Sequence, residues 1–107
     1  MKAIKYVVMS LVLAGFSASA MAQEAEAKAA IDAIKSKAAN AAELVKVAQK
    51  KNKKNPEGLI NIGRAFFEQG DTAQAHVFAD LADNASKHKY APAFILLGDV
   101  AAAENDD

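Results

Sequence analysis

Residues 59–67 read LINIGRAFF, and 35 positions later residues 94–102 read FILLGDVAA. Each copy begins with a large apolar residue, has Ile or Leu three positions on, and has Gly directly after that. Residues three and four apart share one face of a helix, so each copy combines two bulky side chains with a glycine notch that a neighbouring helix can enter. A repeat of this period predicts stacked helical hairpins.

Local signals set the ends of the helices around the first copy. Asn55-Pro56 is a cap followed by proline at the first helical position, which predicts a helix over 56–69. Gly70 supplies a left-handed residue that ends this helix, and Asp71 with Gln74 forms a capping-box pattern for a second helix that ends near 86. Tyr-Ala-Pro at 90–92 restarts the pattern, so we expect a third helix that runs to about 103.

This pattern resembles the tetratricopeptide repeat (TPR), a hairpin of about 34 residues with a Leu-Gly pair and an aromatic in its first helix and small residues in its second. The resemblance covers residues 55–103, as one full repeat and the first helix of another. It implies an all-α fold, a short α-solenoid of antiparallel helical hairpins. The residues at the packing positions of the repeat are Leu59, Ile62, Gly63, Phe66, Ala75 and Ala82 in the first copy and Phe94, Leu97 and Gly98 in the second.

The resemblance also implies a partner-binding surface, because partners of TPR proteins usually bind the concave face lined by the first helix of each hairpin. By position, this face consists of Glu57, Ile60, Asn61, Arg64, Phe67, Glu68, Ile95 and Asp99. Arg64 is the strongest candidate, since a guanidinium can hold a partner's carboxylate through two parallel hydrogen bonds. The alternative is an ion pair within the helix with Glu68, four residues on. The implied function is a non-catalytic scaffold that binds another protein or a peptide.

The N-terminus has the three parts of a secretory signal peptide over residues 1–22. Lys2 and Lys5 precede an apolar run at 7–16, and Ala20-Met21-Ala22 supplies the small residues of a cleavage site. The apolar run is shorter than the roughly 18 residues of a membrane span. We therefore expect an exported protein, periplasmic or extracellular, that begins at Gln23 and has no stable membrane span. The sequence has no cysteine, and so neither disulfides nor a lipid-modified cysteine.

The charge balance argues against nucleic acid as a partner. The whole chain has 13 basic and 13 acidic residues, and removal of residues 1–22 takes away two lysines, which leaves 11 against 13. A basic domain, the usual sign of a protein that binds phosphate backbones, is therefore missing. One basic cluster is present, made of Lys46, Lys50, Lys51, Lys53 and Lys54. We interpret it as a solvated face near a helix C-terminus, with an anionic partner as the alternative if the side chains converge.

Residues 23–54 are rich in Ala, Lys and Glu, and from Glu24 to Asn52 they include neither Gly nor Pro, which predicts helix. The segment forms either one long helix or two, with Asn40 as the cap of a second helix that begins at Ala41. The pattern slightly favours two helices, which would be a degenerate hairpin or a cap on the repeat region.

Catalysis and metal binding find little support. His76 and His88 are twelve positions apart, and no set of nucleophile, base and acid is visible. His76 and Asp80 can share a helix face, but two ligands do not fix a metal. We therefore expect no enzyme activity, no cofactor and no metal site.

The incomplete second copy suggests a shortage of packing partners. TPR arrays usually need about three repeats, because each hairpin buries its face on the next. We therefore expect Leu96, Leu97 and Val100 to lack a covering helix. Three alternatives remain open: the N-terminal helices cap the array, the chain is a self-assembling structural envelope protein and forms a homo-oligomer, or it is a fragment of a longer TPR array in which the acidic tail 104–107 leads into a further helix.

Overall fold

A computed structural model describes residues 18–105. This part of the chain contains five helices and no strand: α2 (Ala18–Ser36), α3 (Ala41–Lys51), α4 (Pro56–Glu68), α5 (Thr72–Ala85) and α6 (Ala91–Asn105). The all-α class is therefore confirmed. The expected signal peptide lies outside the described residues except for 18–22, which begin α2, and residues 106–107 of the acidic tail also lie outside.

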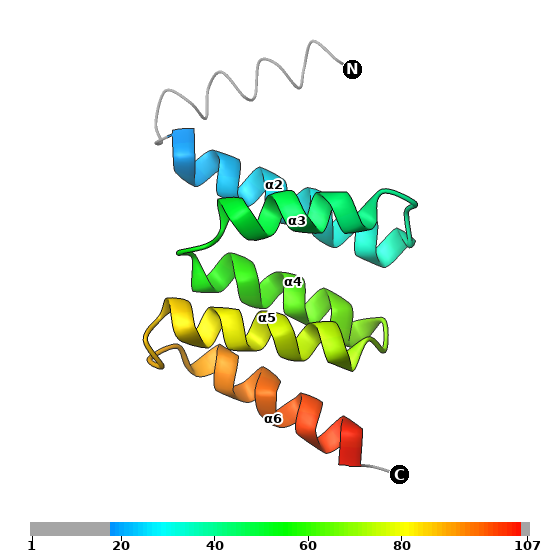
Figure 1. Ribbon diagram of the computed structural model, residues 1–107, viewed down its shortest axis with the longest axis vertical. Coiled ribbons are helices and arrows are strands. Elements are labelled where there is room, and N and C mark those ends of the chain that lie inside the picture. The colour runs from blue at the N-terminus through cyan, green and yellow to red at the C-terminus, as the bar shows by residue number, and fades with distance from the viewer. Residues whose placement is uncertain (1–17, 106–107) are drawn as a thin grey trace.

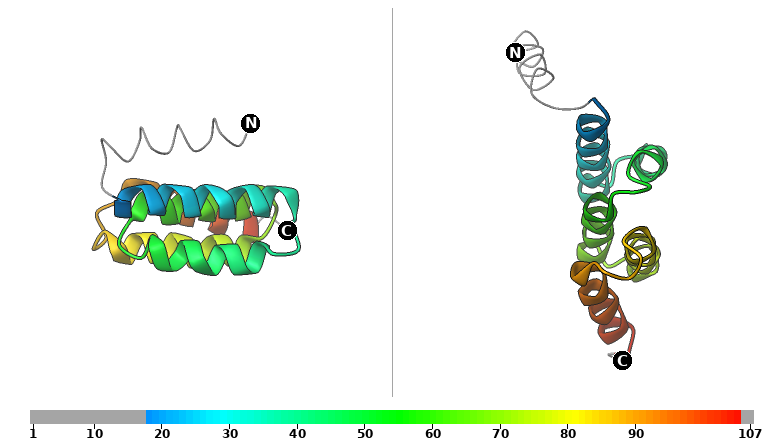
Figure 2. Two further views of the ribbon diagram at one scale, coloured as in Figure 1. Left: turned by 90° about the horizontal axis from the view of Figure 1, so that it is seen from above. Right: turned by 90° about the vertical axis from the view of Figure 1, so that its left-hand side faces the viewer.

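Consecutive helices run antiparallel and form two layers (Figure 1). Helices α2, α4 and α6 are stacked in one column, which we call the front layer, and α3 and α5 lie together on one side of it as the back layer (Figure 2); in the view of Figure 1 it is the back layer that faces the viewer. The stack measures 50 × 32 × 17 Å. One core of mainly Ala, Ile, Leu and Val joins all five helices, so the segment before residue 55 continues the array.

The helix ends follow from the caps that the sequence carries. Pro56 occupies the first turn of α4, and Gly70 after its end has φ +84°, in the left-handed region where glycine is unstrained. The Asp71 carboxylate accepts a hydrogen bond of 3.1 Å from the Gln74 backbone N–H and so caps α5. The predicted ends of these helices agree with the structure to within about two residues.

The Ala-rich segment consists of two helices, since the chain turns between Ser36 and Ala41. Asn40 lies directly before α3, but its side chain makes no capping hydrogen bond. The reversal instead uses Lys37 in the left-handed region at φ 56°, and the Ala38 N–H donates to the Ala33 carbonyl over 2.9 Å. This type of bond satisfies a carbonyl at the helix end without a cap side chain.

A buried amide cluster joins the two hairpins. Asn52 is 0% exposed; its side-chain N–H donates to the Ala48 carbonyl over 2.9 Å, and its Oδ1 accepts from Asn55 over 2.9 Å. A Cβ on Gly58 would lie only 2.1 Å from Asn52 Oδ1, so glycine is needed at this position. Buried amides without partners are costly, and these bonds fix the turn from α3 into α4.

The two repeat glycines have opposite surroundings. A Cβ on Gly63 would lie 2.9 Å from Leu96 Cδ2 and 3.1 Å from Phe78 Cβ, so this notch lets α4 approach α5 and α6 closely. A Cβ on Gly98 would meet nothing within 4 Å. The prediction that Gly98 is a packing position is therefore wrong, because no described helix packs on that side of α6.

The rotation of α6 about its axis also differs from the prediction. Leu96 and Val100 are both 0% exposed, so the prediction that they lack a cover is wrong, and Leu97 is partly buried. Positions 93, 96 and 100, three and four apart, form the face that joins the core. Phe94, expected at a packing position, is instead 49% exposed on the opposite face.

Candidate functional site

The exposed stripe of α4 provides the first part of the candidate site. Glu57, Asn61, Arg64 and Glu68 follow one another at intervals of three and four, so they lie along one face of the helix. Arg64 is half-buried and the other three are exposed. The opposite face of α4 carries Leu59 and Ile62, which are buried in the core and fix the orientation of this stripe.

Side chains of α2 provide the second part. Two adjoining hollows of about 330 and 260 Å³ lie between α2 and α4, and both are lined by Ile31 and Asn61. We call these two hollows together the front groove. Its charged lining residues are Glu24, Lys28 and Lys35 from α2 and Glu57, Arg64 and Glu68 from α4.

The charges in the front groove are ordered from one end to the other. Helices α2 and α4 run in the same direction, so residues early in α2 lie beside residues early in α4 (Figure 1). One end has two carboxylates and one lysine, namely Glu24, Glu57 and Lys28. The other end has two cations and one carboxylate, namely Lys35, Arg64 and Glu68. The groove is therefore more acidic at one end and more basic at the other.

Arg64 pairs across the front layer with α6. Its guanidinium lies 3.9 Å from the Asp99 carboxylate, and the side chains are 40% and 48% exposed. Arg64 and Asp99 occupy the same position in the two sequence copies. Arg64 therefore forms its ion pair with Asp99 and not with Glu68. A half-exposed pair of this kind contributes about 0–1 kcal/mol to stability, so it is easily exchanged for another partner.

Tyr90 is a neighbour of this site that sequence analysis did not identify. Burial raises the pKa of the Tyr90 phenol above its ordinary value of 10.0, the charge of Glu57 raises that pKa further, and Arg64 partly opposes the shift. Both charged groups belong to the exposed stripe of α4. The missed α2 residues had no detectable signal, because the repeat pattern does not extend before residue 55.

Two of the implied partner-binding residues differ from expectation in their exposure. Ile60 is only 2% exposed and belongs to the core that joins the helices, so its assignment to the partner-facing surface is wrong. Phe67 is partly buried and packs against the same core. On α6, Ile95 is 55% exposed and lies one helical turn before Asp99.

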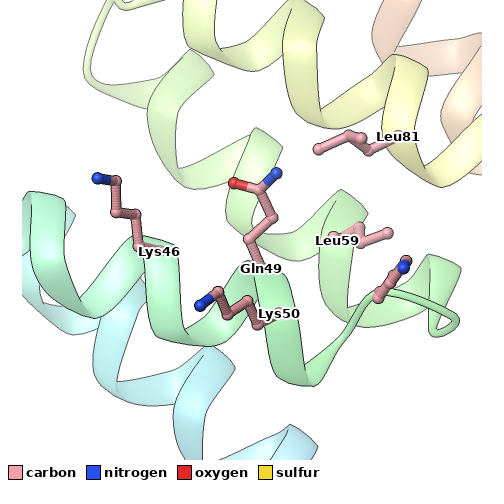
Figure 3. A pocket seen from close by; sticks show the side chains of 6 residues that line it. Lys46, Gln49, Lys50, Leu59 and Leu81 are labelled. Atoms are coloured by element: carbon pink, nitrogen blue, oxygen red, sulfur yellow. The ribbon is translucent and has the colours of Figure 1, made fainter.

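Part of the basic cluster converges on a second depression, in the back layer. Lys46, Lys50 and Lys53 line a hollow of about 560 Å³ together with Gln49, Leu59 and Leu81. Figure 3 shows the labelled side chains around it, contributed by α3, α4 and α5. Lys51 and Lys54 are exposed and are not among the residues that line this hollow.

The remaining polar pairs do not form a larger constellation. His76 Nδ1 lies 3.4 Å from the Asp80 carboxylate on the exposed face of α5. Within residues 18–105, no group of three or more His, Cys, Asp or Glu side chains is placed to hold a metal ion. In the same range, no helix is both long and apolar enough for a membrane span.

Comparison with protein-family models found no match, and comparisons with curated proteins and with solved structures found none of significance. The resemblance to TPR proteins therefore rests on the residues of this chain alone.

Proposed function

We propose that this chain is an exported, non-catalytic scaffold of TPR type that binds a segment of another protein in the front groove. Export is inferred from residues 1–22, and the repeat type from the two sequence copies. The observation that supports binding most is that residues of the α4 stripe and of α2 line the same two adjoining hollows. In TPR proteins, which this chain resembles, partners usually bind the surface formed by the first helix of each hairpin.

The dimensions of the groove favour a short extended segment. From Glu24 to Lys35, α2 advances about 17 Å at a rise of 1.5 Å per residue. An extended chain advances about 3.3 Å per residue, so the groove accommodates roughly five residues. Ile31 and Asn61, which line both halves, lie near its middle and offer one apolar contact and one amide for the backbone of such a segment.

The charge order sets the direction in which the segment lies. The end with Lys35 and Arg64 favours a carboxylate, either an acidic side chain or a C-terminus, because Arg binds carboxylates through two parallel hydrogen bonds. The end with Glu24 and Glu57 favours a basic side chain or an amino group. Asp99 already contacts Arg64, so an incoming carboxylate competes with Asp99 for the guanidinium.

Peptide selection on the chain from Gln23 tests this proposal. Among the residues whose burial is described, the core begins at Ala27, so the chain from Gln23 keeps all of these core residues. We expect a display library of random hexapeptides to yield sequences with acidic residues at one end. Arg64→Ala should weaken binding of a selected peptide about tenfold, which corresponds to about 1.4 kcal/mol. Asp99→Asn should strengthen it by about twofold to threefold, because it frees Arg64 from a pair worth under about 1 kcal/mol.

Matched controls keep the test specific. Lys51→Glu changes an exposed charge that is not among the residues lining the front groove, and we expect it to leave the affinity within about twofold. Equal binding by the wild-type protein and Arg64→Ala, measured by isothermal calorimetry, would contradict the assignment of Arg64. Failure to select any peptide with a charge bias would contradict the proposed groove.

The alternative function, a self-assembling structural envelope protein, draws its support from α6 and not from the front groove. Phe94 and Ile95 are the most exposed large apolar side chains of the described chain, at 49% and 55%.

A further inference from the structure

The back layer contains a trough that its own helices do not fill. Helix α5 packs against both α4 and α6, whereas α3 packs extensively only against α2. Between α3 and α5, two adjoining hollows of about 560 and 440 Å³ share Lys46 and Gln49. We call these two hollows together the back groove.

The back groove has an apolar floor and one basic wall. Val45, Leu59 and Phe78 contribute to the floor. Lys46, Lys50 and Lys53 line the side of α3, while the side of α5 carries Gln74, Val77 and Leu81. Residues 43–54 contain five lysines and one glutamate, for a formal charge of +4. The occupant that fits this trough is therefore apolar and acidic.

Helix α6 has both properties. Between Ala91 and Asn105 it contains Asp99 and Glu104 and no basic residue, for a formal charge of −2. Apart from these two acids, its outer face is apolar as well as its core face, and an apolar helix face is normally buried. Its outer face, which we call the α6 stripe, is exposed along its whole length and consists of Phe94, Ile95, Gly98, Ala101 and Ala102.

We propose that the back groove of one copy binds the α6 stripe of a second copy. The apolar face of a helix laid into an apolar groove is a common mode of recognition between proteins. The described chain exposes four large apolar side chains, namely Val47, Val77, Phe94 and Ile95, and this contact covers the last three of them. Lys50 lies in the last turn of α3 and Lys53 two residues beyond its end, while Glu104 lies in the last turn of α6, so the bound helix runs parallel to α3.

Two other occupants fit the observations less well. A small molecule is usually buried over roughly 70–90% of its surface, which a trough open along its length does not achieve. Pairing of α6 with α6 of a second copy would join two helices that each have a formal charge of −2, and like charges oppose such a contact. The groove-to-stripe contact is heterologous, so each bound copy keeps one free groove or stripe and further copies can add.

Sedimentation velocity of the chain from Gln23 tests this contact. From about 10 µM to about 1 mM at low salt, we expect the average mass to rise beyond that of a dimer, and high salt should reverse part of the rise because it screens the lysines. Lys46→Glu with Lys50→Glu should raise the dissociation constant at least about tenfold, since it reverses the charge of the groove wall. The matched control, Lys51→Glu with Lys54→Glu, makes the same charge change outside the groove and should shift it less than about threefold.

Mixing two variants distinguishes this contact from any symmetric one. Phe94→Glu with Ala101→Glu disables the stripe but leaves the groove, and the lysine variant has the reverse defect. At a concentration where the wild-type protein has begun to associate, each variant alone should be monomeric, and their mixture should give a one-to-one heterodimer and nothing larger. Circular dichroism checks that each variant folds, and Val77→Glu replaces any groove variant that does not, because Val77 is 44% exposed. A monomer at every concentration, equal effects of the two lysine variants, or a mixture without heterodimer would overturn the proposal.

Discussion

A single residue, Tyr90, allows the charges of the candidate site to be followed by spectroscopy. The sequence has two tyrosines and no tryptophan, and the other tyrosine, Tyr6, belongs to the expected signal peptide. In the chain from Gln23, the ultraviolet absorbance of tyrosinate therefore reports Tyr90 alone. Burial and the charge of Glu57 raise the pKa of Tyr90, whereas the charge of Arg64 lowers it. The midpoint of the tyrosine titration therefore depends on two charges of the α4 stripe.

We expect the Tyr90 titration to have its midpoint above the ordinary pKa of 10.0. Glu57→Gln should lower this pKa and Arg64→Ala should raise it, because they remove opposite charges. Since the folded-state pKa is raised, the stability that Tyr90 contributes is complete below the unfolded pKa and is lost as the pH rises through the folded value. The melting temperature of Tyr90→Phe should therefore fall less than that of the wild-type protein on going from pH about 9 to about 11. Parallel titrations of the wild type and Glu57→Gln would contradict this account.

At the scale of the element, the repeat glycines make a matched pair. Gly→Ala in a helix interior gains about 1 kcal/mol of helix propensity at either position. Gly98→Ala should keep this gain, since nothing lies within 4 Å of the new Cβ, whereas Gly63→Ala meets Leu96 and Phe78. We expect the first variant to be more stable than the second by about 1–3 kcal/mol, measured by urea unfolding at low protein concentration. Equal stabilities would show that the notch at Gly63 does not control the packing.

Sequence analysis predicted the ends of α4, α5 and α6 because caps and turns are local chemistry. Each of these signals sets a helix end within about one turn of its own position, as Asn55-Pro56, Gly70 and Asp71 do. The rotation of α6 was not predictable in the same way. Helix α6 is apolar on every side, so its periodicity does not say which face is buried, and Phe94 and Leu96 were assigned to the opposite environments from those observed.

At the scale of the whole molecule, the front groove depends on α2 lying beside α4. The α4 half of the groove followed from the repeat pattern, and Glu57, Asn61, Arg64 and Glu68 do line it. The α2 half of the groove could not be predicted from the repeat pattern, because Lys28, Ile31 and Lys35 lie in a segment that has no repeat glycine. The pairing of Arg64 with Asp99 likewise depends on how α6 docks, which no local signal sets.

The central claim, that the front groove is the partner-binding surface, is tested most directly by amide chemical-shift mapping of a selected hexapeptide on the isotopically labelled chain from Gln23. The account predicts that the largest shifts fall on α2 between Glu24 and Lys35, on α4 between Glu57 and Glu68, and on Tyr90, and that α3 and the outer face of α5 change little. Shifts confined to the back groove around Lys46 and Lys50, or spread evenly over all five helices, would contradict it.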